Sequence, residues 1–155
     1  MLKLILFAPC ERHIQSLENL SSLIAVMENI NVELGEGLPP EAAIPMKWTV
    51  VTLWHREKDY DTPVIYQERV EVIKPDGVSM GSIVLEFEVS NENLNYRSIR
   101  DLFGFPIGLQ GQVTVRVSLR EKGENARWNE VATYPIQVKH HPKKEDGREE
   151  PAAQI

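Results

Sequence analysis

The stretch GQVTVRVSLRE, residues 111–121, constrains the fold more than any other part of the chain. Its apolar side chains alternate strictly with polar ones, so every second residue belongs to the same face of a β-strand. The apolar set is Val113, Val115, Val117 and Leu119. One apolar face and one polar face are typical of a half-buried antiparallel strand.

The same pattern, or an enrichment in β-branched and aromatic residues, recurs along most of the chain between turn residues. We therefore predict strands over residues 2–7, 22–34, 46–56, 64–73, 83–89, 111–121 and 128–138. Residues 96–103 fit either a short strand or a helical turn. Pro135 indicates that the last strand is an edge strand or contains a bulge.

Residues 11–34 are the one segment whose apolar residues fit both the helical period and the strand period. We predict a polar loop over residues 11–19, followed by a long strand that breaks near residues 28–29. Leu17, Leu20, Ile24 and Met27 have helical spacing, so a helix is the alternative, although Asn31 interrupts its apolar stripe.

The chain has 155 residues, of which 42% are hydrophobic, enough for one domain with a substantial core. The pattern predicts an all-β fold, an antiparallel β-sandwich of about eight strands with jelly-roll or Greek-key topology, and a barrel as the alternative. The sandwich domain would span residues 1–138. Residues 139–155 are polar and charged, which predicts a disordered tail.

Several short segments carry a resemblance. The segment NLSSLIAV, residues 19–26, the turn Lys74-Pro75-Asp76-Gly77 and the stretch LQGQVTV, residues 109–115, are similar to a family of uncharacterised bacterial single-domain β-sandwich proteins. The resemblance covers about residues 2–138. It implies the fold and a bacterial protein, and it supplies no catalytic residues.

Charge and composition argue against several classes of partner. The net charge is −6 and the isoelectric point is about 5.3, so we expect no nucleic-acid partner. No segment has the roughly 20 apolar residues of a membrane helix. The apolar run of residues 4–8 is too short for a signal peptide. A single cysteine, Cys10, cannot form an internal disulfide, and we expect a cytoplasmic protein.

No cofactor or metal motif stands out. The H-x-H pair of metal-dependent jelly rolls is absent, and the adjacent His140 and His141 would point to opposite faces of a strand. A nucleophilic pair of Cys10 and His13 would need a third, orienting group that the sequence does not reveal. The glycines before residue 111 lead into a strand rather than a helix, so they do not form a phosphate loop.

Tryptophans are the first candidate binding residues. Trp48, Trp54 and Trp128 would stack on sugar rings if they were exposed together on one face. Core packing is the simpler interpretation of Trp48 and Trp54.

The loop GFPIGLQG, residues 104–111, is the second candidate because it carries Phe105, Ile107 and Leu109. If successive strands alternate in direction, it shares one end of the sandwich with residues 35–44 and 75–82. The charged turns 57–62 and 121–127 then lie at the other end. The loop is either a partner-binding surface or a plug that closes the core. We expect Leu109 to pack inward and Phe105 to be more exposed.

Without a catalytic constellation, the leading hypothesis is a non-enzymatic protein-binding or scaffolding module, with a protein partner or a second copy as its ligand. A carbohydrate-binding module is the alternative. A hydrolase or isomerase with a site scattered over loops is the third hypothesis, because catalytic groups need not be close in sequence.

Overall fold

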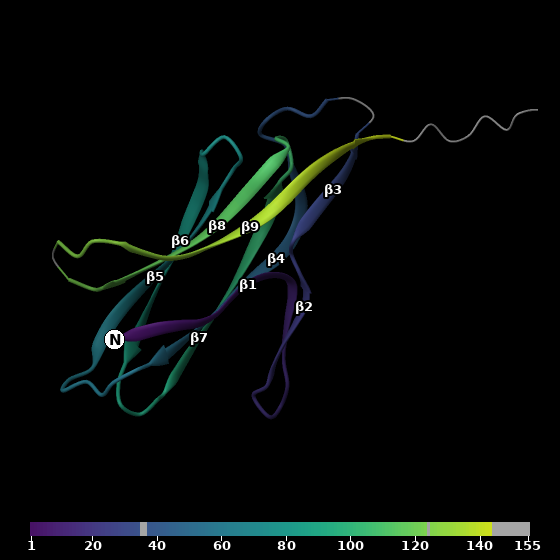
Figure 1. The fold of residues 1–155 in the computed structure, drawn as a ribbon. Helices are drawn as coiled ribbons and strands as arrows, with labels where there is room; N and C mark the ends of the chain where they lie inside the picture. The colour runs from purple at the N-terminus through teal and green to yellow at the C-terminus, as the bar shows by residue number, and fades with distance from the viewer. Residues whose placement is uncertain (35–36, 124, 144–155) are drawn as a thin grey trace, which may run out of the picture.

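The computed structural model describes residues 1–34, 37–123 and 125–143. These residues form nine strands and no helix (Figure 1), so the predicted all-β sandwich is confirmed. The strands are β1 (Leu2–Gln15), β2 (Ser21–Val26), β3 (Asn29–Leu34), β4 (Ala43–Arg56), β5 (Val64–Ile73), β6 (Ser79–Val89), β7 (Asn95–Pro106), β8 (Gly111–Glu121) and β9 (Asn129–Pro142).

The strands form two sheets. The four-stranded sheet is antiparallel and has the order β2-β1-β4-β7, and the five-stranded sheet has the order β3-β9-β8-β5-β6. The facing orders β1-β4-β7 and β9-β8-β5 are those of immunoglobulin-type sandwiches, which have Greek-key connections.

The five-stranded sheet is mixed, whereas the sequence predicted a purely antiparallel sandwich. β3 runs parallel to β9, with Val32 paired with His140. The predicted long strand over residues 22–34 does break where expected, but its two halves, β2 and β3, belong to different sheets. The chain changes sheets at Met27 and Glu28, which brings β3 alongside β9 in the parallel direction.

Three other boundaries differ from the expectation. Residues 11–15 continue β1 as a hairpin with β2, so the predicted polar loop is shorter. β7 is a strand over its full length, and its helical alternative is wrong. β9 extends through Lys139 to Pro142 because β3 offers it a pairing partner. Residues 144–155 of the predicted tail lie outside the described residues.

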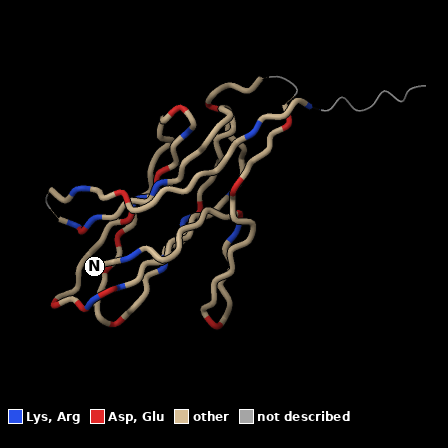
Figure 2. Tube along the Cα trace, viewed as in Figure 1, with Lys and Arg blue, Asp and Glu red and all other residues tan. Residues whose placement is uncertain are grey.

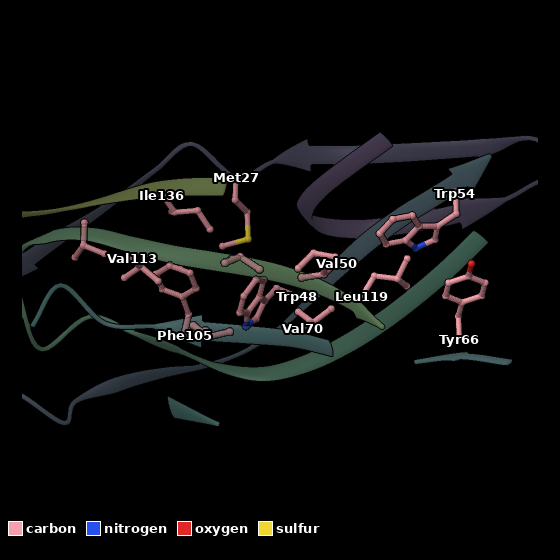
Figure 3. Packing of buried hydrophobic residues seen from close by; sticks show 14 of the residues in the cluster. Met27, Trp48, Val50, Trp54, Tyr66, Val70, Phe105, Val113, Leu119 and Ile136 are labelled. Atoms are coloured by element: carbon pink, nitrogen blue, oxygen red, sulfur yellow. The ribbon is translucent and has the colours of Figure 1, made fainter. Parts of the chain in front are cut away.

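The core lies between the sheets and follows the predicted alternation. In β8, Val113, Val115 and Val117 are fully buried, and the polar residues between them face the other side. Trp48 and Trp54 in β4 are also buried, which confirms their predicted core packing. Figure 3 shows these large side chains packed between the sheets, with Trp48 beside Phe105.

The two lateral sides of the sandwich, where the edge strands of the two sheets lie, differ. On one side, which we call the closed side, the chain crosses from β2 to β3. The buried Met27 lies in this crossing, and its amide donates a hydrogen bond to the Pro9 carbonyl (3.0 Å). The ring of Phe7 in β1 also contacts that of Tyr134 in β9, with centroids 6.0 Å apart. On the open side, the strands β6 and β7 are the two sheet edges.

Candidate functional site

The open side combines two free sheet edges with two pockets. β6 pairs only with β5 and β7 only with β4, so each presents a free backbone edge. Two pockets of about 240 and 290 Å³ open between these strands. We name this feature the seam, defined by residues 80–87 of β6 and 96–104 of β7.

The first pocket of the seam is apolar. Its floor comes from the core side chains Trp48, Val70 and Val72, and its walls include Ile83 of β6 and Leu102 of β7. It therefore has the chemistry to accept an aliphatic or aromatic side chain.

The second pocket of the seam is richer in aromatic rings. Trp54, Phe87 and Tyr96 line it together with Leu85 and polar residues of the β6–β7 turn. The Phe87 ring centroid lies 5.9 Å from that of Tyr96, so the aromatic wall is continuous.

Behind Phe87, the ring of Tyr66 stacks at a centroid distance of 6.2 Å. Burial raises the pKa of the Tyr66 phenol, and the hydrogen bonds with Tyr60 and Glu121 raise it further. Tyr66 therefore stays neutral and acts as a fixed support for the pocket wall at ordinary pH.

Arg100 lies between the two pockets. It pairs with Val50 of β4, a core residue, and so faces the interior side of β7. Its neighbours in the same row are Leu102, which lines the first pocket, and Ser98, which lines the second. The Nη1 atom donates a hydrogen bond to the Ile99 carbonyl (2.9 Å).

The Arg100 Nη2 atom is buried without a hydrogen-bond partner among the described residues. None of the ion pairs within the described part of the chain involves Arg100. Arg100 lines neither pocket of the seam.

A buried carboxylate lies deeper between the sheets. Glu68 of β5 is only 1% exposed and accepts hydrogen bonds from three neutral donors of the other sheet. These are Thr52 Oγ1 (2.6 Å), Trp54 Nε1 (2.5 Å) and Ser98 Oγ (2.7 Å). The donors satisfy the carboxyl oxygens, which offsets much of the cost of burying a polar group.

Sequence reasoning missed Glu68, although the signal was present. Tyr66, Glu68 and Val70 share one row of β5 by the period of two, and both Tyr66 and Val70 are core residues. An acidic side chain in a core row indicates a buried polar network.

Two exposed apolar side chains border the first pocket. Phe103 of β7 is 77% exposed and Met80 of β6 is 46% exposed. Exposed apolar residues beside a pocket are typical of interaction sites.

The predicted loop candidate has a different role. Phe105 is fully buried, with its ring centroid 5.4 Å from that of Trp48, so the expectation that it is exposed is wrong. Ile107 is also buried, and Leu109 is half-buried. The loop therefore plugs the end of the core.

As predicted, this loop lies beside residues 37–44, and Gly111 at its end lies beside Pro75. The Ile107 amide donates to the Ala42 carbonyl (2.9 Å). A Cβ at Gly108 would lie 2.2 Å from the Pro39 carbonyl oxygen, so only glycine permits this close approach.

The orientation of Phe105 follows from an irregularity in the β4–β7 pairing. Phe103 pairs with Lys47 on the outer row, and the register then shifts so that Phe105 pairs with Ile44. Gly104, with φ +86°, lies between the two phenylalanines. The shift turns Phe105 into the core and leaves Phe103 outside.

The three tryptophans do not form a common surface. Trp48 and Trp54 are each 1% exposed. Trp128 lies under the guanidinium groups of Arg69 and Arg120, which are 4.6 and 4.1 Å from its ring centroid. The stacking platform expected of a sugar-binding face is absent from the described residues.

The structure brings a third group to the Cys10–His13 pair. A surface pocket of about 430 Å³ is lined by His13, Lys47, Thr49 and Asp101, among others. However, Cys10 is fully buried, and burial raises the pKa of its thiol. A protonated thiol without solvent access is a poor nucleophile.

Asp101 is also engaged elsewhere. It pairs with Lys47 Nζ (2.9 Å) and accepts a hydrogen bond from Thr49 Oγ1 (2.9 Å). These hydrogen bonds, from Lys47 first and then from Thr49, lower the pKa of Asp101. The carboxylate is thus held by two partners other than His13.

The remaining histidines bond to separate groups. His140 contacts the Ile107 carbonyl (2.6 Å), His141 contacts Asn31 (3.0 Å) and His55 contacts Asn95 (2.9 Å). Within residues 1–34, 37–123 and 125–143, no three His, Cys, Asp or Glu residues are grouped to hold a metal ion. The same residues contain no helix with the length and hydropathy needed to cross a membrane.

Charges of both signs are scattered along the strands (Figure 2). At the seam, the outer row of β6 is acidic, with Glu86 and Glu88, and Glu86 pairs with Lys122 (2.8 Å). Arg100, by contrast, belongs to the inward-facing row of β7.

The fold and the seam together define the class, a β-sandwich domain with one open lateral side. Comparisons with protein-family models, curated proteins and solved structures find no match to this chain.

Proposed function

We propose that this chain is a non-enzymatic protein-binding module and that the seam is its binding surface. The observation that carries the proposal is the free backbone edge of β6, which lies directly beside two side-chain pockets. An extended peptide that pairs with β6 would gain main-chain hydrogen bonds from the edge and specificity from the pockets.

The direction of the backbone groups in β6 follows from its neighbours. The Ile65 carbonyl accepts a hydrogen bond from the Lys122 amide (2.8 Å) on the β8 side. Successive residues of an antiparallel strand bond to opposite neighbours, so Glu68 bonds toward its partner Leu85 in β6. The intervening residues of β6, Val84 and Glu86, therefore direct their amides and carbonyls to the free edge.

This edge lacks two of the features that block strand addition and has its irregularity at one end. β6 contains neither proline nor lysine, the residues that commonly protect an edge strand. Its pairing with β5 is regular from Ser82 to Val89, and the register shifts only before Ser82. Eight residues of regular edge are long enough for an added strand of ordinary length.

The test removes one edge donor. Val84→Pro deletes an amide that faces the free edge, whereas Val84→Ala keeps it. A phage-displayed library of random peptides is panned against the wild-type protein, and dissociation constants of the selected peptides are measured for both variants. We expect Val84→Ala to bind as the wild type does and Val84→Pro to bind at least about tenfold more weakly, the effect of one or two net hydrogen bonds.

Hydrogen exchange of the wild-type complex gives a second measurement if Val84→Pro does not fold. The amides of Val84 and Glu86 should become protected when peptide binds. Selection of no peptide, or equal binding by Val84→Pro with no added protection in β6, would overturn the proposal.

A further inference from the structure

We propose that the seam selects an extended segment that carries an aliphatic and an aromatic side chain four residues apart and a basic residue beside the aromatic one. The aliphatic side chain enters the first pocket, and the aromatic one enters the second. This inference rests on the proposed function, since it assigns the chemistry of the ligand that pairs with β6.

The spacing follows from the positions of the two pockets along the strands. Ile83 of β6 lines the first pocket, and Phe87, four residues further along, lines the second. The inner row of β7 repeats this distance, with Leu102 in the first pocket and Ser98 in the second. Four residues of a strand span about 13 Å, and residues an even number apart point to the same side. A ligand strand along β6 therefore reaches both pockets with residues i and i+4.

The middle position of the ligand, i+2, lies opposite Leu85. Leu85 lines the second pocket and pairs with Glu68 of β5. The Glu68 carboxyl group already accepts hydrogen bonds from three donors, one of which is Ser98 Oγ. An apolar neighbour and a satisfied carboxyl group favour a small uncharged residue at i+2.

The two pockets differ in their share of aromatic rings. Most apolar side chains around the first pocket are aliphatic, such as Val70 and Leu102. Those around the second pocket are mostly aromatic, namely Trp54, Phe87 and Tyr96. The Phe87 and Tyr96 rings are inclined at 34° with their centroids 5.9 Å apart, and a third ring can add an edge-to-face contact to such a pair. The second pocket therefore favours an aromatic side chain.

The outer row of β6 determines the charge that suits the ligand. Glu86 and Glu88 flank Phe87 in the sequence, so the ligand residues beside its aromatic side chain lie opposite them. Glu86 pairs with Lys122 (2.8 Å). Glu88 is exposed, its β5 neighbour is the apolar Ile65, and no ion pair within the described part of the chain involves it. A lysine or arginine opposite Glu88 would form a cross-strand ion pair. The net charge of −6 also attracts a basic segment over longer distances.

A second copy of this chain would satisfy only part of these requirements. Its β6 carries Ile83 and Phe87 at the right spacing. However, its outer row would bring a further Glu86 and Glu88 to the same face, where like charges repel and no basic residue meets Glu88. The charge of β6 therefore favours a different partner with a basic segment.

The test uses two synthetic peptides with blocked termini, TKFTTTLTT and TTLTTTFKT, which present the motif antiparallel and parallel to β6. Each is compared with a control of the same composition, TKFTTLTTT or TTTLTTFKT, in which the apolar side chains are three residues apart and point to opposite faces. NMR titration measures the affinities. For the peptide that binds better, we expect its control to bind at least about tenfold more weakly, since one apolar side chain is no longer buried.

The indole N–H signals report which pocket is filled. The Trp48 Nε1 atom donates to the Gly104 carbonyl (3.0 Å) at the first pocket, and the Trp54 Nε1 atom donates to Glu68 (2.5 Å) at the second. A peptide with alanine in place of leucine should no longer shift the Trp48 signal but should still shift that of Trp54. A peptide with alanine in place of phenylalanine should do the reverse.

Variants of Glu88 test the charge. A peptide with Glu in place of Lys should bind the wild-type protein roughly fivefold more weakly, as expected for one cross-strand charge pair. Glu88→Lys should reverse this preference. Glu18→Lys is the control, because it changes the net charge by the same amount in the exposed β1–β2 turn, and it should keep the preference for Lys. Thermal midpoints verify that both variants are folded.

The outcomes distinguish the inference from the function beneath it. Equal binding of the spacing controls, a preference for Lys that survives Glu88→Lys, or selected peptides that bind at β6 without an apolar pair at i and i+4 would overturn the inference. The proposed function would still stand if Val84→Pro weakened the binding. Failure of all peptides, selected and synthetic, to bind would overturn both. A concentration-dependent dimer that Val84→Pro abolishes would replace the peptide with a second copy.

Discussion

The closed and open sides of the sandwich hold the two sheets together by different means. On the closed side the backbone itself passes between the sheets, and the crossing buries Met27. On the open side the backbone crosses between the sheets only at one end, through the turn of residues 90–94 between β6 and β7. Along the strands of this side, the Glu68 side chain of β5 bonds to three donors in β4 and β7, and the β6 and β7 edges beside the seam pockets stay free.

Along its strands, the open side therefore has a polar cross-link between the sheets in addition to the turn that joins β6 to β7. Hydrogen bonds to a buried carboxylate form only when the donors lie at particular positions, whereas apolar side chains stay in contact when the sheets shift slightly relative to each other. Glu68 therefore fixes the separation of β5 from β4 and β7 and so the width of the seam. The first prediction breaks this cross-link.

Glu68→Ala should have the largest effect. It removes the shared acceptor and leaves three buried donors, of which each unsatisfied group costs about 1–3 kcal/mol. We expect the free energy of unfolding to fall by at least about 3 kcal/mol, a large part of the total for a domain of this size. Urea denaturation measures the change.

Glu71→Ala is the matched control, because Glu71 lies in the same strand but pairs with Arg116 on the outer face. A loss of similar size in both variants would show that the Glu68 network does not hold the open side.

Met27→Ala tests the closed side in the same way. Met27 is 5% exposed, and truncation of a buried methionine costs about 2–5 kcal/mol through lost apolar burial and cavity formation. Because the backbone crossing remains, the seam should keep its shape. Peptide affinity is expected to be unchanged while the urea midpoint falls; a parallel loss of affinity would contradict the separation of the two sides.

Gly104→Ala tests the irregularity that turns Phe105 inward. A Cβ at this position meets no atom within 4 Å, so the cost comes from the positive φ alone. That cost is about 1–2 kcal/mol. Gly77→Ala is the control, because Gly77 also has a positive φ but lies in the β5–β6 turn. It should lower the free energy of unfolding by about the same amount without changing the NMR signals of Phe105. A Gly104→Ala variant as stable as the wild type would mean that the local backbone relaxes.

Phe103→Ala should have the smallest effect on stability. Phe103 is 77% exposed, and surface substitutions usually change the free energy of unfolding by less than about 0.5 kcal/mol. Phe103 lines the first pocket, so peptide affinity should fall even though the thermal midpoint does not. An unchanged affinity would exclude Phe103 from the binding surface.

The alternation of apolar and polar residues predicted most of the strands because one face of each is buried. The same alternation also indicates that Glu68 is buried, because Glu68 lies between Tyr66 and Val70 in the inward-facing row of β5. The pattern alone does not say which donors from another sheet will meet a carboxylate, since Thr52, Trp54 and Ser98 come from two distant strands. Sequence reasoning therefore locates the buried acid but not its network.

The seam was beyond the reach of the sequence for a different reason. Pockets between edge strands depend on sheet order, and the order of β6 and β7 is set by pairings between segments far apart in the chain. Phe105 was misplaced because residues 104–111 were predicted as a loop, whereas β7 continues to Pro106 and a register shift at Gly104 turns Phe105 into the core. Arg100 showed no signal either, since an arginine in a weakly patterned strand is normally solvated.

The parallel pairing of β3 with β9 has a consequence for synthesis of the chain. Val32 cannot pair with His140 until the ribosome has added 108 more residues, which takes roughly 5–20 s at ordinary translation rates. During that interval the apolar side chains of β3 have no sheet to join. The nascent chain therefore carries an unpaired strand until translation has almost reached the end of β9, which makes β3 a segment available to a chaperone throughout that interval.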